Sequence, residues 1–241
     1  MGLRSRAKKQ GSDQRRDEEA GIEVRYRQAI AGGDGETLLG LGTELIMSGG
    51  HDVQAEDLLR RAVEAGAAGA LLQLGLLLSV VPGREAEAEE QLRRAVDAGE
   101  VGALNHLALW LADPPGREAE AEVLFRRAIE AGSALAVTNL ARVLGNQPGR
   151  EAEAEGLYKQ AVAGGDLDAL DDFGLLLNIL PGRQAEAEEA LRRSIEAGST
   201  CAIANLAYVL SSQPGREAEA DELYGQAVAA GEIQVLQDLG L

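Results

Sequence analysis

Two patterns of apolar positions alternate along the chain, and both have the period of a helix. In the first, leucines recur at i, i+3 and i+7, as at Leu71, Leu74 and Leu78, which marks one face of a helix. In the second, a small residue is followed four positions later by a large one, as at Ala88 and Leu92. Each pattern stops at a turn signal, so the chain is predicted to fold into pairs of helices.

The turn signals recur every 33 residues. A Pro-Gly-Arg string follows the first pattern in five copies, and proline is confined to turns because it lacks a backbone N–H. Its prolines are Pro82, Pro115, Pro148, Pro181 and Pro214. The second pattern ends in an anchor residue, which is Ala29, Ala62, Ala95, Ala128, Ala161, Ser194 or Ala227. A glycine follows four residues after every anchor, as a helix that ends in a left-handed residue requires.

This register predicts an all-α fold, an α/α solenoid (superhelix) of about seven 33-residue helix-turn-helix repeats over residues 17–241. One helix pair cannot bury its own apolar faces, but stacked pairs share a continuous core. Residues 1–16 have no apolar period and contain six basic residues and one acidic residue. We expect them to form a disordered basic tail.

Charged residues on the second helix of each pair follow the helix dipole, with acids near its start and arginine or lysine near its end. Several of them have the stabilising i, i+4 order. These pairs are Glu56–Arg60, Glu89–Arg93, Glu122–Arg126, Glu155–Lys159 and Glu188–Arg192. They are expected to form a solvated face and not a pair of catalytic carboxylates.

Composition supports helices and limits the partners. Apolar residues make up 45% of the 241 residues but aromatic residues only 3%, which disfavours strands. The net charge of −17 makes nucleic acid an unlikely partner for the repeats, since their charge repels phosphates. The segment 65–81 is apolar but too short to span a bilayer, and its counterparts in later repeats are more polar, so no membrane helix is expected.

The segment RRAVEAGAAGALLQLG resembles the Sel-one-like repeat, in which Ala, Gly, Ala and a Leu-Gly or Leu-Ala pair recur at fixed spacing. Here these residues are Ala62, Gly66, Ala70, Leu74 and Gly75. The turn within each pair is shorter than is usual in that family, and leucine replaces most of its aromatic residues, so the chain is nearly as similar to tetratricopeptide repeats. The resemblance implies a superhelix whose concave side receives peptides or proteins, with no cofactor.

No pattern of catalytic, cofactor-binding or metal-binding residues stands out. The chain has no Gly-Lys dipeptide for a phosphate-binding loop, and His51 and His106 lack ligand spacing. The single cysteine, Cys201, fits a reducing, cytoplasmic compartment and is expected to pack as a small buried hydrophobe, although a helix N-terminus could activate its thiol. Trp110 replaces smaller apolar residues of other repeats and is expected to be at least half-buried.

The sequence therefore predicts a non-enzymatic scaffold or adaptor that binds a protein or peptide. Two alternatives stay open: a self-assembling regulatory subunit, and a protein that binds polyanions through its basic tail. Self-assembly would use the C-terminal end, where Ile233, Leu236 and Leu239 lack the partner helix that covers their counterparts in earlier repeats.

The predicted partner-binding groove contains the positions at which the repeats differ, which lie ten, eleven and fourteen residues after each anchor. They are Leu72, Gln73, Leu76, Asn105, His106, Leu109, Thr138, Asn139, Arg142, Asp171, Asp172, Leu175, Ala204, Asn205 and Tyr208. Arg142 and Tyr208 are the expected anchors, because Arg and Tyr are enriched where binding energy concentrates. Arg142 is the one Lys or Arg among these positions, so a ligand held by its C-terminal carboxylate is not expected.

Overall fold

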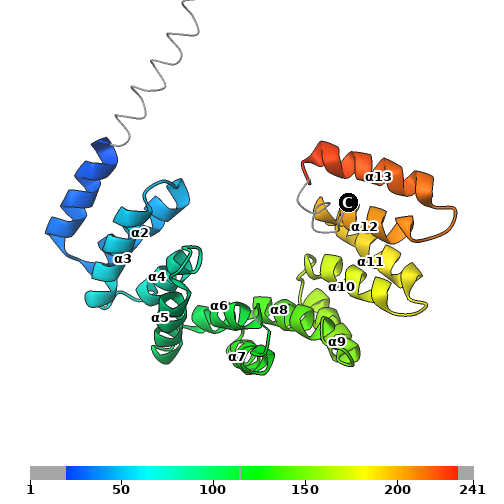
Figure 1. Cartoon of the computed structure of the whole chain (residues 1–241), viewed down its shortest axis with the longest axis horizontal. Coiled ribbons are helices and arrows are strands. Elements are labelled where there is room, and N and C mark those ends of the chain that lie inside the picture. Colours follow the sequence, from blue (N-terminus) through cyan, green and yellow to red (C-terminus); the bar gives the residue numbers. More distant parts are fainter. Residues whose placement is uncertain (1–19, 114, 233–241) are drawn as a thin grey trace, which may run out of the picture. The chain divides into compact units, whose positions relative to one another are not determined.

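We describe the protein from a computed structural model, which covers residues 20–113 and 115–232. Every regular element in these ranges is a helix, namely a helix over residues 20–32 followed by α2 to α13 (Figure 1). The predicted all-α fold of helix pairs is therefore confirmed. The basic tail and the C-terminal residues Ile233, Leu236 and Leu239 lie outside the described residues.

The chain divides into two compact units, Met1–Leu107 and Ala108–Leu241. The first unit contains α2 (Gly35–Ser48), α3 (Asp52–Glu64), α4 (Ala70–Ser79) and α5 (Glu85–Asp97). The second contains α7 (Glu118–Glu130), α8 (Ala134–Gly145), α9 (Glu151–Ala163), α10 (Ala169–Ile179), α11 (Gln184–Glu196), α12 (Cys201–Ser211) and α13 (Glu217–Ala230). Helix α6 (Val101–Ala112) contains the boundary.

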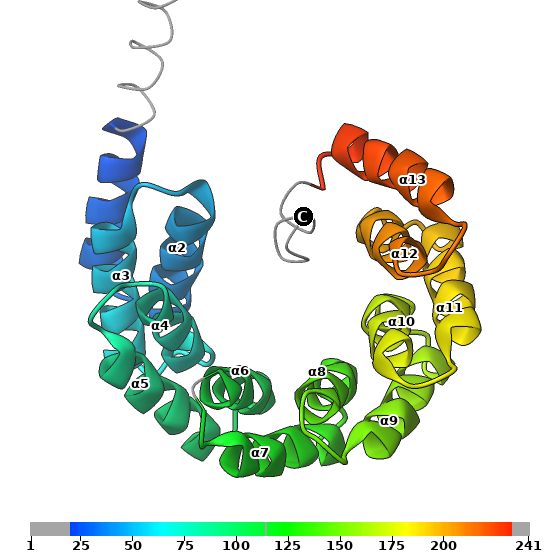
Figure 2. The same cartoon turned by 45° about the vertical axis from the view of Figure 1, so that its right-hand side comes forward.

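The helices alternate between two positions in the repeat. We call the even-numbered ones A-helices and the odd-numbered ones B-helices. Each of α2, α4, α8, α10 and α12 packs along the B-helix that follows it. In the second unit, α8, α10 and α12 form one layer and α7, α9, α11 and α13 the other (Figure 2). This unit thus presents an A-helix layer and a B-helix layer.

The turn after each B-helix has the predicted left-handed glycine. Gly132 follows α7 with a φ of 90°, and its N–H donates to the carbonyl of Ile129 at 2.9 Å. The next N–H, of Ser133, donates to the carbonyl of Ala128 at 2.9 Å, so carbonyls of the last helical turn are satisfied. The other glycines of this register also have a positive φ. They are Gly33, Gly66, Gly99, Gly165, Gly198 and Gly231.

The core is formed by small residues facing large ones, as the second apolar pattern predicts. On the B-helices, Ala121 and Phe125 of α7 are both fully buried. A-helices approach closely where their own residue is small: a Cβ placed on Gly174 of α10 would lie 2.6 Å from Cγ of Leu191 on α11. The spacing between helices is therefore set by a glycine or alanine on one side and a leucine or aromatic residue on the other.

Rings of four charged side chains join consecutive B-helices. Between α7 and α9, Arg126 contacts Glu122 at 2.7 Å and Glu153 at 2.6 Å, while Arg150 contacts Glu122 at 3.1 Å and Glu153 at 2.6 Å. Equivalent rings consist of Glu56, Arg60, Arg84 and Glu87 in the first unit and of Glu188, Arg192, Arg216 and Glu219 in the second. The predicted i, i+4 pairs are confirmed. An arginine of the next repeat also contacts Glu56, Glu122, Glu155 and Glu188.

The ring between α9 and α11 is incomplete because lysine replaces one arginine. Lys159 contacts Glu155 at 2.7 Å, and Arg183 joins Glu155, at 3.1 Å, to Glu186. Among the described residues, Lys159 has no second carboxylate partner. The hydrogen bonds from Arg183 and Lys159 lower the pKa of Glu155 to about 2. Ionised Glu155 is therefore strongly favoured in the folded state.

We expect Gly132→Val to lower the free energy of unfolding by about 1–3 kcal/mol, since a β-branched residue is strained at positive φ. Nothing lies within 4 Å of the new Cβ, so the strain comes from the backbone alone. The control is Gly156→Ala on α9, where the same addition meets open space at an ordinary φ and should stabilise by up to about 1 kcal/mol. Urea unfolding measures both, and an unchanged Gly132→Val would contradict the left-handed cap.

We expect Arg183→Gln to lower the free energy of unfolding at pH 7 modestly, because two partly exposed ion pairs are lost. A carboxyl whose pKa is lower in the folded state stabilises the fold fully above its pKa in the unfolded state. This contribution is lost as the pH falls through the pKa of the folded state. The difference from the wild type should therefore shrink below about pH 4.5 and vanish only once the pH falls below about 2. Arg127→Gln, at an exposed arginine outside the rings, is the control, and a difference that does not shrink between pH 4.5 and pH 2 would exclude Glu155 as the cause.

Candidate functional site: the A-helix layer

The predicted groove positions all lie on A-helices, but they are not equally accessible. On α4, Leu72, Gln73 and Leu76 are half-buried, as are His106 and Leu109 on α6. Asn105 and Asn205 are each 7% exposed, and Ala204 is fully buried. In the second unit the most open of these side chains are Arg142 on α8 and Tyr208 on α12, which is 37% exposed.

The first column of the predicted groove, ten residues after each anchor, joins neighbouring repeats in the second unit. Thr138 on α8 donates a hydrogen bond from Oγ1 to Asp166 at 2.6 Å. One repeat later the roles are reversed, and Ser199 donates from Oγ to Asp171 on α10 at 2.7 Å. Thr138 and Asp171 thus each form a hydrogen bond to the turn that leads into the next A-helix. These two side chains, which the sequence suggested for ligand binding, are therefore used in contacts within the fold.

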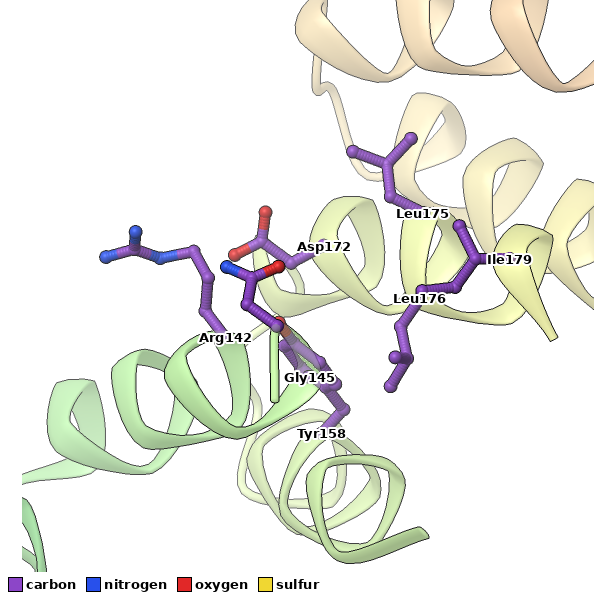
Figure 3. Close-up of a pocket in the computed structure, with 8 residues that line it drawn as sticks. Arg142, Gly145, Tyr158, Asp172, Leu175, Leu176 and Ile179 are labelled. Atoms are coloured by element: carbon purple, nitrogen blue, oxygen red, sulfur yellow. The ribbon is translucent and has the colours of Figure 1, made fainter. Parts of the chain in front are cut away.

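A hollow opens beside the remaining columns, between α8 and α10 (Figure 3). It has a volume of about 300 Å³. Its lining residues are Arg142, Gly145, Asn146, Tyr158, Asp172, Leu175, Leu176 and Ile179. Three of these, Arg142, Asp172 and Leu175, are groove positions predicted from the sequence. The structure therefore brings part of the predicted set together around one recess.

The floor of the hollow is made by two features that sequence comparison of the repeats did not single out. Tyr158 of α9 is 2% exposed and stacks on Phe173, with ring centroids 5.7 Å apart. Gly145 ends α8 where other repeats have Ser79, Ala112, Asn178 or Ser211, and its missing side chain leaves space beside Leu176. The feature of the sequence that could have indicated the hollow is this glycine, at a helical position where the other repeats have a side chain.

Asp172 is the chemically unusual group at this site. Burial raises the pKa of its carboxyl, Arg142 lowers it, and Asp171 and Asp166 raise it further. This shift occurs even though the first turn of a helix favours a carboxylate. Among the described residues, no hydrogen-bond donor or ion-pair partner contacts Asp172, whereas both neighbouring aspartates accept hydrogen bonds. Burial also raises the pKa of Tyr158 above its usual range, and the charge of Asp172 adds to that effect.

The other candidate residues are dispersed. His51 precedes α3, and burial lowers the pKa of His106 on α6. Cys201 begins α12 as expected, but it is exposed and not buried, because its position faces the turn beside Glu232. Partial burial and the nearby Glu232 raise the pKa of its thiol, which opposes activation by the helix N-terminus. Trp110 is half-buried, as expected.

The described residues also bear on two other kinds of site, a metal site and a membrane-spanning helix. No group of three or more His, Cys, Asp or Glu side chains in this part of the chain could hold a metal ion. No helix over the same residues has the length and apolar character needed to cross a bilayer. The apolar segment 65–81 is interrupted by the turn that precedes α4.

The repeated helix pairs, with a glycine turn and a small-to-large core, define an α/α repeat array. No protein-family model matches the sequence, and a search of curated proteins finds no match. Among solved structures, the Sel1 repeat protein from Oxalobacter formigenes is similar, with a TM-score of 0.60 and 19% identity over 87% of this chain and 99% of that protein.

A second similar structure is c5321, a protective antigen of uropathogenic Escherichia coli with an SLR fold. Its TM-score is 0.59 at 20% identity, and the match covers 89% of this chain and 50% of c5321. The chain thus spans half the length of that protein. At these identities the likeness shows the fold: the chain has the Sel-one-like repeat fold that its sequence predicts.

We expect Asp172→Asn to raise the free energy of unfolding at pH 7 by about 1 kcal/mol, because it removes a half-buried charge that has no hydrogen-bond partner. A carboxyl whose folded-state pKa is raised destabilises the fold when ionised. The gain should therefore be complete above that raised pKa and disappear below the ordinary value of 3.8.

The matched control is Asp168→Asn, at an exposed position just before the same helix, which should be neutral or slightly destabilising. Urea unfolding at several pH values distinguishes the two variants. A loss of stability in Asp172→Asn at pH 7 would show that the carboxylate supports the fold.

Proposed function

We propose that the chain is a non-enzymatic scaffold that binds a protein or peptide through the A-helix layer of its second unit. The observation that carries this proposal is the hollow between α8 and α10, whose lining combines buried core residues with the exposed side chains of Arg142 and Ile179. A repeat array offers an extended surface for such a ligand. The hollow supplies a recess in which a few side chains of a partner can be anchored.

The two layers differ in how their side chains are used. On the B-helix side, charged side chains such as Arg126 of α7 and Arg150 at the start of α9 are engaged in the rings that join repeats. On the A-helix layer, the guanidinium of Arg142 makes one long contact, a hydrogen bond to Asn139 at 3.4 Å. Ile179 is 66% exposed and borders the same hollow. This difference supports the A-helix layer as the binding face.

The alternatives draw less support from the described residues. Binding of polyanions would use the tail over residues 1–16, and self-assembly would use the C-terminal end, and both lie outside the described residues. An enzyme would need a group activated for proton or nucleophile chemistry. Cys201, the one thiol of the chain, has a raised pKa, and His51 and His106 lie on different helix pairs.

The test places a photo-crosslinking amino acid at Leu175 on the A-helix layer and, in a second variant, at Val123 on α7. Val123 is 57% exposed on a B-helix and is not a ring residue, so it is a matched control for the opposite layer. Irradiation in the cells that produce the protein should give an adduct with a discrete protein from position 175 and none from position 123. Mass spectrometry identifies the partner and the crosslinked segment.

The same adduct should be lost when Tyr208→Ala and Arg142→Ala are introduced together, with unchanged melting as the control for folding. Adducts from position 123 alone would mean that the B-helix layer is the binding face. Adducts from neither position would contradict a scaffold that uses this unit.

A further inference from the structure

The three aspartates near the hollow differ in one respect. Asp166 accepts a hydrogen bond from Thr138, and Asp171 accepts one from Ser199. Asp172 accepts none within the described part of the chain, although it is half-buried. A carboxylate that is partly removed from water and left without a donor is costly for the fold. A donor supplied by a ligand would remove that cost.

Arg142 does not supply this donor. Its guanidinium extends away from the other labelled residues, and Asp172 lies between Arg142 and the apolar residues of α10 (Figure 3). Arg142 is exposed and forms no ion pair with Asp172. The side chain of Arg142 therefore lies at the rim and leaves the carboxylate accessible.

The charge around the hollow favours a cation over an anion. Asp166 and Asp171 both act on Asp172 electrostatically, and Arg142 is the one opposing charge that does so. A ligand carboxylate that approached Arg142 would also meet these three aspartates. Like charges brought together at an interface reject a partner, and opposite charges favour it.

An apolar wall stands next to the carboxylate. Leu175, Leu176 and Ile179 follow Asp172 along α10 and line the same recess. Ile179 is 66% exposed, which is unusual for an isoleucine of this chain. The wall can receive the aliphatic stem of a long basic side chain or an apolar side chain beside it.

We propose that the hollow between α8 and α10 receives a lysine or arginine side chain of a bound peptide, which pairs with Asp172. A neighbouring apolar side chain of the peptide rests on Leu175 and Ile179. The inference depends on the proposed function and specifies its ligand as a basic and apolar peptide segment. It moves the main anchor from Arg142, expected from the sequence, to Asp172.

The test selects peptides from a phage-displayed random library on the full chain. Selected peptides should contain a lysine or arginine next to Leu, Ile, Val or Phe. A synthetic peptide of the selected sequence, acetylated and amidated at its ends, is then measured by calorimetry. Replacing its basic residue with norleucine should weaken binding at least about tenfold, because a partly buried carboxylate is again left unpaired.

Variants of the chain separate the anchor from its surroundings. Asp172→Asn should weaken binding of the same peptide at least about tenfold while leaving the fold intact. Asp168→Asn, an exposed carboxylate of the same helix pair, should leave binding unchanged. Binding to the wild type should weaken as the pH falls and Asp172 is protonated, and binding to Asp172→Asn should not.

Two results would overturn the inference in distinguishable ways. If the selected peptides are acidic and lose affinity with Arg142→Gln, the scaffold function stands and Asp172 is not the anchor. If no peptide is selected, or if binding survives both Asp172→Asn and Leu175→Glu, this layer does not bind peptides and the proposed function fails as well.

Discussion

A single helix pair of this chain cannot cover its own apolar faces, and the structure follows from that constraint. Where two neighbouring helices pack closely, a small residue on one lies against a large residue on the other, as with Gly174 of α10 and Leu191 of α11. Because close packing tolerates little change in volume, the small residue fixes how near the helices come. The same spacing decides which A-helix positions stay uncovered and so where a ligand can approach.

The charged rings add register to this packing. Apolar contacts alone permit small sliding of one repeat along another, whereas a ring such as that of Glu122, Arg126, Arg150 and Glu153 is complete in one alignment only. The energy of each ion pair is modest at a partly exposed position, but the network holds several at once. The ring positions recur from repeat to repeat, whereas the A-helix positions of the predicted groove differ between repeats.

The sequence predicted what depends on short spacing and missed what depends on neighbouring repeats. Helix pairs, glycine caps and i, i+4 ion pairs all follow from residues within one turn of each other. The second partner of Glu122 is Arg150, which a local pattern cannot reveal. At Thr138 and Asp171, variation between repeats wrongly suggested ligand binding. These positions differ because each is hydrogen-bonded to a different residue of the neighbouring repeat, Asp166 for Thr138 and Ser199 for Asp171. The hollow depends on an absent side chain at Gly145, and its carboxylate is unusual only because the fold half-buries it.

The rings have a consequence for how such a chain changes over generations. Every complete ring takes two residues from one repeat and two from the next, at positions that recur every 33 residues. When recombination removes or duplicates one whole repeat, the repeats that become neighbours therefore still have charged residues at the ring positions. The hollow beside Gly145 takes its lining from two consecutive repeats, so it is copied only when both are duplicated together and is lost when either is removed. Array length can thus change in single steps without passing through a mismatched intermediate.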